Sequence, residues 1–218
     1  MEYRRRIIME ILRMKTKTIL IGFFILAFGL NLNAQSQEDL QKAFVDSYSY
    51  ESIGKYTDAV QSLKKYYSNE SYEINVRLAW LSYMSGQYTE SISYYQKSIK
   101  LQPLSIEARL GLCYPASAVG NWEQVIQQYD EIIKVAPNNY TANLRLGQIY
   151  MNRKKYTQAS KHLDLLISQY PFTYDVMINT AWNYYYQGKL REAKVLFQKV
   201  LLIYSNDESA LLGLKSIK

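Results

Sequence analysis

The side chains that could do chemistry are few and stand apart in the sequence. His162 is the single histidine and precedes Asp164 by two residues, and Cys113 is the single cysteine. A Ser/His/Asp or Cys/His arrangement needs a nucleophile within hydrogen-bond reach of its base, and Cys113 belongs to a different predicted helix. We therefore expect His162 to be a solvated surface residue and Cys113 a small core side chain. No catalytic residue is predicted.

Metal and cofactor chemistry has no better support in the sequence. Metal sites usually combine three or more His, Cys or carboxylate ligands, and no glycine-rich phosphate loop occurs. We therefore predict a protein that is not an enzyme, with no cofactor and no metal site. The basic run Arg153-Lys154-Lys155 has two interpretations. It is a solvated turn, or it contacts an acidic partner.

The charge of the chain is concentrated at its N-terminus. The formal net charge is +7, and residues 1–34 carry six basic side chains against two acidic ones, which leaves +3 for the rest. A nucleic-acid-binding surface would need basic residues clustered in the folded part of the chain. We therefore predict no nucleic-acid partner.

Residues 1–34 have the three parts of a signal peptide. Basic residues precede an apolar run from Ile19 to Leu30, and the small residue Ala34 follows. The run is shorter than the roughly 20 residues that a membrane-spanning helix needs. We expect cleavage after Ala34 and a periplasmic or secreted protein. Two alternatives stay open: an uncleaved helix that anchors the protein to a membrane, and a translation start later than residues 1–13.

The elements that would position a site come from an internal repeat. One turn pattern recurs at residues 54–59, 86–91, 120–125, 154–159 and 188–193, in steps of 32, 34, 34 and 34 residues. A small residue precedes each turn and a bulky residue follows it. The small residues are Ser47, Ala79, Gly111, Gly147 and Ala181, and the bulky ones are Leu63, Tyr95, Tyr129, Leu163 and Phe197. Pro103, Pro137 and Pro171 then end three of the units.

This pattern resembles the tetratricopeptide repeat, in which two helices form each unit and stacked units bury a continuous core. The resemblance implies an all-α, right-handed solenoid of about five helix-turn-helix units plus a C-terminal capping helix. The expected organisation is a signal peptide at 1–34, a linker at 35–39 and a repeat domain at 40–218. Its units are 40–71, 72–105, 106–139, 140–173 and 174–207, with the cap at 208–218.

The third unit departs from the pattern. Leu110 precedes Gly120 by ten residues, whereas Leu78 precedes Gly86 by eight. We therefore expect a longer first helix in this unit, kinked at Pro115.

In the tetratricopeptide-repeat family that this pattern resembles, certain positions of the first helix of each unit, helix A, line a concave groove. The corresponding residues here are Phe44, Tyr48, Val76, Trp80, Tyr83, Leu112, Leu144, Gln148, Ile178, Trp182, Tyr185 and Tyr186. We expect Trp80, Tyr83, Trp182 and Tyr185 to face away from the second helix of their unit. The tyrosines at 50, 114, 150 and 184, and those at 56, 88 and 156, are expected in the core. The alternative is that tight coiling, or residues 35–40, covers the groove aromatics.

Three arginines, Arg77, Arg109 and Arg145, are interpreted as one repeated position just before a leucine. Such a row could meet the carboxylates or carbonyls of an extended peptide, or pair with neighbours such as Glu73 and Glu107. We therefore predict a scaffold that binds a protein or peptide in its groove, outside the cytoplasm. Its contact with a membrane would come only from an uncleaved signal segment. The alternative function is a glycan-binding module of the cell envelope that uses the groove aromatics.

Overall fold

The computed structural model describes residues 37–217, and every regular element in that range is a helix. The signal peptide predicted at 1–34 lies outside these residues. Within them, no helix combines the length and the apolar character needed to cross a membrane. The chain divides into two compact units, the first ending at Ser68 and the second running from Asn69. We describe each unit by itself.

The first unit is a pair of helices. Residues 37–52 form one helix, which already includes residues 37–39 of the predicted linker, and α2 (Tyr56–Lys64) forms the other. Ala43 and Leu63 are buried, and Ser62 donates a hydrogen bond to the Ala43 carbonyl at 3.2 Å. Gly54 makes the tight turn between the helices with a φ of +74°.

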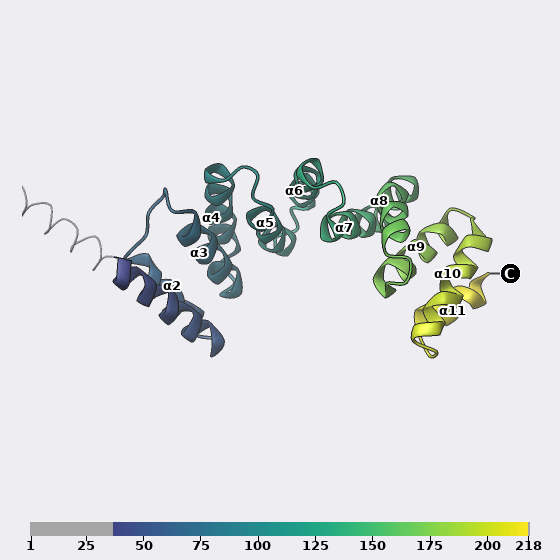
Figure 1. Ribbon diagram of the computed structural model, residues 1–218, viewed down its shortest axis with the longest axis horizontal. Helices are drawn as coiled ribbons and strands as arrows, with labels where there is room; N and C mark the ends of the chain where they lie inside the picture. The colour runs from purple at the N-terminus through teal and green to yellow at the C-terminus, as the bar shows by residue number, and fades with distance from the viewer. Residues whose placement is uncertain (1–36, 218) are drawn as a thin grey trace, which may run out of the picture. The chain divides into compact units, whose positions relative to one another are not determined.

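The second unit contains nine helices in its described part (Figure 1). They are α3 (Tyr72–Met84), α4 (Tyr88–Leu101), α5 (Ile106–Ala118), α6 (Trp122–Val135), α7 (Tyr140–Asn152), α8 (Tyr156–Gln169), α9 (Tyr174–Tyr186), α10 (Leu190–Ile203) and α11 (Glu208–Ser216). The odd-numbered helices are the A helices and the even-numbered ones the B helices of successive pairs. Each packs on the next along the chain. The predicted all-α repeat architecture is confirmed.

Local sequence explains where the helices begin. Ser71, Ser105, Asn139 and Asp207 each precede an A helix, and their side chains accept a hydrogen bond from the backbone N–H three residues later. Such caps satisfy amide groups that a helix leaves open. At the A-to-B turns the chain needs a positive φ, which glycine adopts without strain. Gly86, Gly120 and Gly188 supply it, whereas Lys154 takes this position with a φ of 57°.

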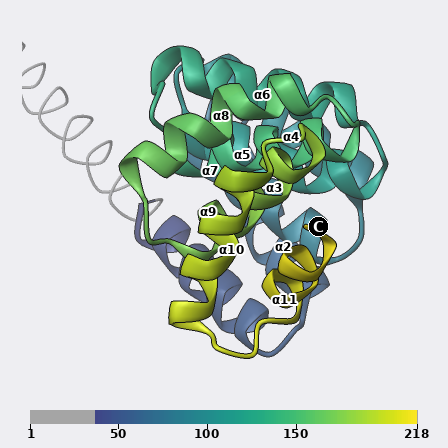
Figure 2. The same cartoon turned by 90° about the vertical axis from the view of Figure 1, so that its right-hand side faces the viewer.

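The second unit has two layers of helices. Figure 2 shows α4, α6 and α8 on one side and α3, α5 and α7 on the other. Several A helices also contact the next A helix: α3 meets α5, α7 meets α9, and α9 meets α11. Among the described helices, no B helix packs to a comparable extent on the next B helix. The A helices therefore form the inner layer of this unit.

The third pair corrects the expected register. α5 has 13 residues, as do α3, α7 and α9, and it continues through Pro115 as one helix. Counted from the helix start, the eighth residue is Ala79 in α3 and Cys113 in α5. Gly111 is instead the sixth residue, where a Cβ atom would overlap the ring of Tyr95 in α4. The prediction of a longer first helix in the third unit was therefore wrong, and so was the equivalence of Gly111 with Ala79.

Candidate binding face

The ninth residues of α3, α5, α7 and α9 share one repeated position on the A helices, which form the inner layer of the second unit. These residues are Trp80, Tyr114, Gln148 and Trp182. Aromatic residues one turn further along α3 and α9 extend the same face: Tyr83, Tyr185 and Tyr186. Two groups of rings form as a result. We call Trp80, Tyr83, Tyr88 and Tyr114 the first cluster, and Tyr156, Trp182, Tyr185 and Tyr186 the second cluster.

In the first cluster, rings from α3, α4 and α5 meet. The Tyr83 ring lies 5.7 Å from Trp80, 5.6 Å from Tyr114 and 5.9 Å from Tyr88, measured between centroids. Trp80 also meets Tyr114 edge-on at 6.1 Å. Tyr114 remains 54% exposed. The prediction that Tyr114 belongs to the core was wrong, because the true register of α5 places it at the ninth position.

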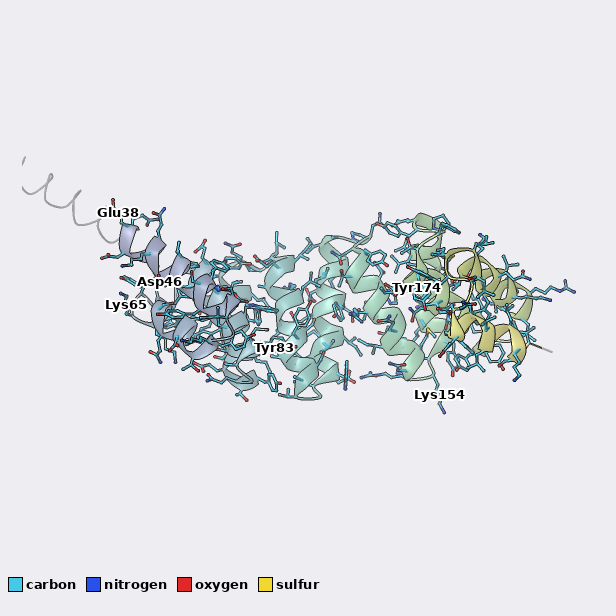
Figure 3. All side chains as sticks on the ribbon, turned by 90° about the horizontal axis from the view of Figure 1, so that it is seen from below. Glu38, Asp46, Lys65, Tyr83, Lys154 and Tyr174 are labelled. Atoms are coloured by element: carbon cyan, nitrogen blue, oxygen red, sulfur yellow. The ribbon has the colours of Figure 1, made fainter. Side chains whose placement is uncertain are left out.

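In the second cluster, Tyr186 stacks on two neighbours. Its ring is nearly parallel to that of Tyr156, at 5.1 Å and 17°, and to that of Trp182, at 5.8 Å and 29°. Tyr185 meets both Trp182 and Tyr186 edge-on. A hollow of about 550 Å³ opens beside these rings, lined by Met151, Asn152, Lys154, Tyr156, Trp182 and Tyr186. In Figure 3 the labelled Lys154 side chain extends from the turn between α7 and α8.

Trp182 does more than line this face. Its ring meets the buried ring of Phe197 in α10 at 5.1 Å, and its indole Nε1–H donates a hydrogen bond of 2.8 Å to Ser209 in α11. The expectation that Trp182 faces away from the second helix of its unit was therefore wrong. This tryptophan joins three helices and presents the rest of its ring to the hollow.

The three arginines do not form one repeated row. Arg77 and Arg145 are sixth residues of their helices, whereas Arg109 is the fourth residue of α5. Arg77 is only 6% exposed. Arg109 donates hydrogen bonds to Gln128 at 2.9 Å and to the Pro103 carbonyl at 2.8 Å. Arg145 is exposed and bonds to Gln148 at 3.0 Å. The equivalence of the three positions was wrong.

The other expected groove residues divide between core and surface. Leu112, Leu144 and Ile178 are buried, and Val76 is half-buried. Phe44 and Tyr48 belong to the first unit, where Phe44 is half-buried and Tyr48 is exposed. A role in ligand binding stays a prediction for all of the groove residues. The sequence reasoning missed Tyr88, Tyr114 and Tyr156 as members of the two clusters, because it placed all three in the core. Counting back from Gly120 would have found Tyr114.

His162 and Cys113 are structural side chains. His162 is half-buried, its Nδ1 lies 3.0 Å from Asn143 Oδ1, and its ring stacks on Tyr150 at 5.8 Å. Burial, with a smaller effect of Lys161, lowers its pKa. The solvated histidine was thus a wrong prediction, whereas the buried thiol is confirmed. Burial raises the pKa of Cys113 to about 12. No cluster of three metal-binding side chains occurs among residues 37–217.

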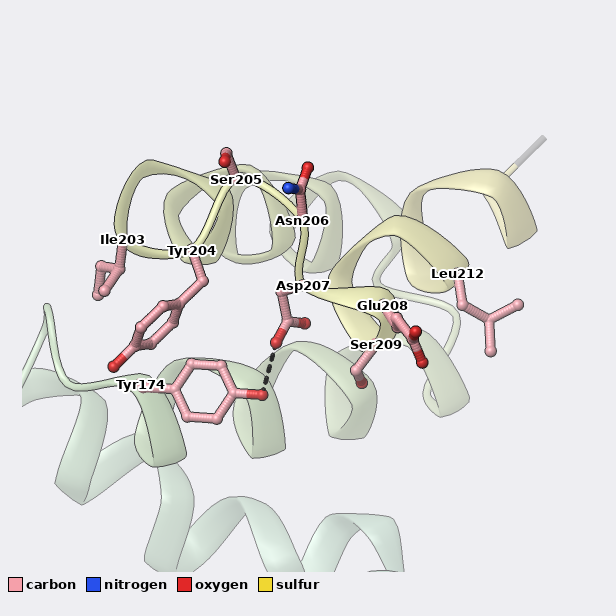
Figure 4. A pocket seen from close by; sticks show the side chains of 9 residues that line it. All are labelled: Tyr174, Ile203, Tyr204, Ser205, Asn206, Asp207, Glu208, Ser209 and Leu212. Carbon is pink, nitrogen blue, oxygen red and sulfur yellow. Dashed lines mark hydrogen bonds between the residues drawn. The ribbon is translucent and has the colours of Figure 1, made fainter.

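A second hollow lies where α10 leads into α11 (Figure 4). Tyr174 donates a hydrogen bond of 2.7 Å to Asp207, whose other carboxylate oxygen accepts from the Ala210 amide. That hydrogen bond and burial raise the pKa of Tyr174 to about 12. Tyr72 makes the equivalent contact with Ser105, at 2.6 Å. Because this joint recurs between units, we assign the hollow a structural role.

Comparison with known proteins agrees with this architecture. Three family models, each described as tetratricopeptide repeat, match residues 72–103, 116–176 and 175–207. A stretch of 86 residues is 26% identical to human sperm-associated antigen 1. This stretch covers 39% of this chain and 9% of that protein.

Solved structures share the fold at low sequence identity. A tetratricopeptide repeat protein from Parabacteroides merdae superposes with a TM-score of 0.72 and 16% identity, over 83% of this chain and 72% of that one. MamA from Desulfovibrio magneticus, in a form titled 41-end, gives a TM-score of 0.66 and 14% identity, over 78% of this chain and 97% of that one.

Proposed function

Because this chain belongs to the tetratricopeptide-repeat family, whose fold suggests a protein-interaction scaffold, we propose that it holds a peptide segment on the inner face of its second unit. One observation carries the proposal: two clusters of aromatic rings, mostly from the A helices, lie on that face. Tyr114 and Tyr186 are 54% and 51% exposed. Partly exposed rings of this kind are the residues that most often dominate binding energy.

A peptide is better supported than a glycan. A sugar ring binds by stacking on an open aromatic face, but Tyr186 already lies nearly parallel to Tyr156 and Trp182. The Trp182 indole N–H is also committed to Ser209. The second cluster combines apolar rings with tyrosine hydroxyl groups, which suit the mixed apolar and polar surface of a peptide.

Selection of random dodecapeptides on the immobilised protein tests the proposal. We expect selected peptides to bind on the order of tenfold more weakly to the Tyr114→Ser or Tyr186→Ser variant. Phe172→Ser is the matched control, because Phe172 is 58% exposed and belongs to neither cluster. Peptides that lose affinity only for the Phe172 variant, or failure to select any binding peptide, would contradict the proposal.

We also propose that the protein acts outside the cytoplasm, on the strength of the signal features in residues 1–34. N-terminal sequencing of the protein from its native host should then give a first residue at or near Gln35. An intact Ile19–Leu30 segment in the membrane fraction would instead support the anchored alternative.

A further inference from the structure

We propose that the hollow beside the second cluster binds an acidic peptide, with an apolar side chain against the rings and a neighbouring carboxylate at Lys154. This inference rests on the proposed function, because it assigns a chemical class to a peptide held on the same face. Three observations carry it: the charge of the lining, the orientation of the rings and the backbone at Lys154.

The lining carries one charged side chain, and it is positive. Of the six residues around the hollow, Lys154 is the only basic side chain and none is acidic. Lys154 forms no ion pair with another residue in the described range, whereas its neighbour Arg153 bonds to Glu123 at 2.9 Å. A carboxylate placed here would therefore gain a partner without competing with an internal one.

The remaining polar groups also favour an electron-rich ligand. Tyr186 stacks on both Tyr156 and Trp182 and remains 51% exposed. Aromatic edges carry partial positive charge. Tyrosine hydroxyls and the Asn152 amide can donate hydrogen bonds. A nucleobase or a ligand cation would have to compete with the stacking that these rings already make with one another.

The backbone at Lys154 is unusual for its residue type. Its φ of 57° lies in the left-handed region, where the other described turns of this kind have glycine. A residue with a Cβ atom is strained there relative to an ordinary conformation. Strained residues of this kind cluster at binding and catalytic sites. The first cluster provides an internal comparison, since the α3–α4 turn beside it has Gly86 and no cation.

Fluorescence anisotropy with three labelled peptides tests the inference. The probes are Ser-Gly-Glu-Phe-Glu-Gly-Ser and the same peptide with Gln or Lys in place of both Glu residues. We expect the Glu probe to bind the full protein on the order of tenfold more tightly than the Gln probe, and the Lys probe to bind most weakly. Lys154→Glu should abolish or reverse this order. Lys155→Glu is the matched control, because it makes the same charge change one residue outside the hollow.

Each other outcome has a defined meaning. If Lys154→Glu and Lys155→Glu act alike, the effect is general surface charge and the inference is overturned. If the Gln probe binds as tightly as the Glu probe and still needs Tyr186, the inference fails while the proposed function stands. Tighter binding of labelled oligothymidylate than of the Glu probe also overturns it. If no probe binds, the inference fails, and the random-peptide selection separately decides the proposed function.

Discussion

The hydrogen bond between His162 and Asn143 determines which ring nitrogen of the histidine carries its proton. The Asn143 side-chain nitrogen donates to the carbonyls of Pro137 and Asn139, at 2.8 and 2.9 Å. Its oxygen must therefore face His162 and accept, so His162 Nδ1 is the donor. Burial lowers the pKa of the ring, and so does the nearby Lys161. The folded protein consequently favours neutral His162.

This arrangement predicts a pH dependence of stability. A lowered pKa in the folded state means that the unfolded chain binds the proton more readily. The contribution of His162 should be fully present above its unfolded pKa of about 6.5. It should decrease as the pH falls through that value and level off below the folded pKa. Between pH 8 and pH 5, the melting temperature of the His162→Gln variant should decrease less than that of the wild-type protein. An identical pH profile would contradict the prediction, because the chain has a single histidine.

A second residue-scale prediction concerns Gly111. Its position allows the Tyr95 ring to lie directly against the α5 backbone, and an added Cβ atom would overlap that ring. Gly111→Ala should therefore destabilise the protein by about 1–3 kcal/mol, despite the better helix propensity of alanine. The check is urea denaturation of a double-mutant cycle with Tyr95→Leu. We expect Gly111→Ala to cost less in the Tyr95→Leu background, and additive effects would show that the ring is not the cause.

At the scale of the elements, Trp182 ties α9 to α10 and α11. Trp182→Phe keeps an aromatic ring near Phe197 but removes the hydrogen bond to Ser209, and should cost about 0.5–1.5 kcal/mol. Trp182→Ala should cost more, approaching about 3 kcal/mol, because it also leaves a cavity beside Phe197. Urea denaturation measures both free energies of unfolding. If Trp182→Ala leaves the free energy of unfolding unchanged, the Trp182 ring is a surface feature and does not hold α9 to α10 and α11.

The helix pairs could be predicted from the sequence because turns and caps are local. Gly86, Gly120 and Gly188 mark turns that need a positive φ, and each lies at the same distance from its helix start. The same count applied to Gly120 gives the register of α5, but the small residue expected inside the helix does not. Gly111 and Cys113 are both small and lie two residues apart, and the packing of Tyr95 shows why the glycine stands at the sixth position.

The candidate site was predictable in its composition and not in its connections. The aromatic residues of α3 and α9 were identified, but Tyr114 of α5 was missed. Stacking between Tyr156 and Tyr186 also joins residues of different units. The same holds for Trp182 and Ser209, which lie 27 residues apart. Contacts between units depend on how the units stack, and the repeat pattern alone does not specify that geometry.

Across the second unit, each helix contacts only near neighbours in the stack. Removal of residues 207–218 should therefore act locally. It deletes the partners of Tyr174 and Trp182 and uncovers the Phe197 ring. We expect faster amide hydrogen exchange in α9 and α10, with the effect decreasing toward α3. A uniform increase along the whole unit, or none, would contradict a cap that acts through its nearest neighbours.

The pairing of a large ring with a glycine also limits how such a chain can grow by tandem duplication. Phe197 of α10 faces Gly213 of α11, as Tyr95 of α4 faces Gly111 of α5. A second copy of residues 174–207 inserted after the first would place Phe197 opposite Asn179, which is the sixth residue of α9. The duplicated junction would then lack the space that the ring occupies. The units are therefore not interchangeable parts, and their order is encoded in matched pairs of side chains across each junction.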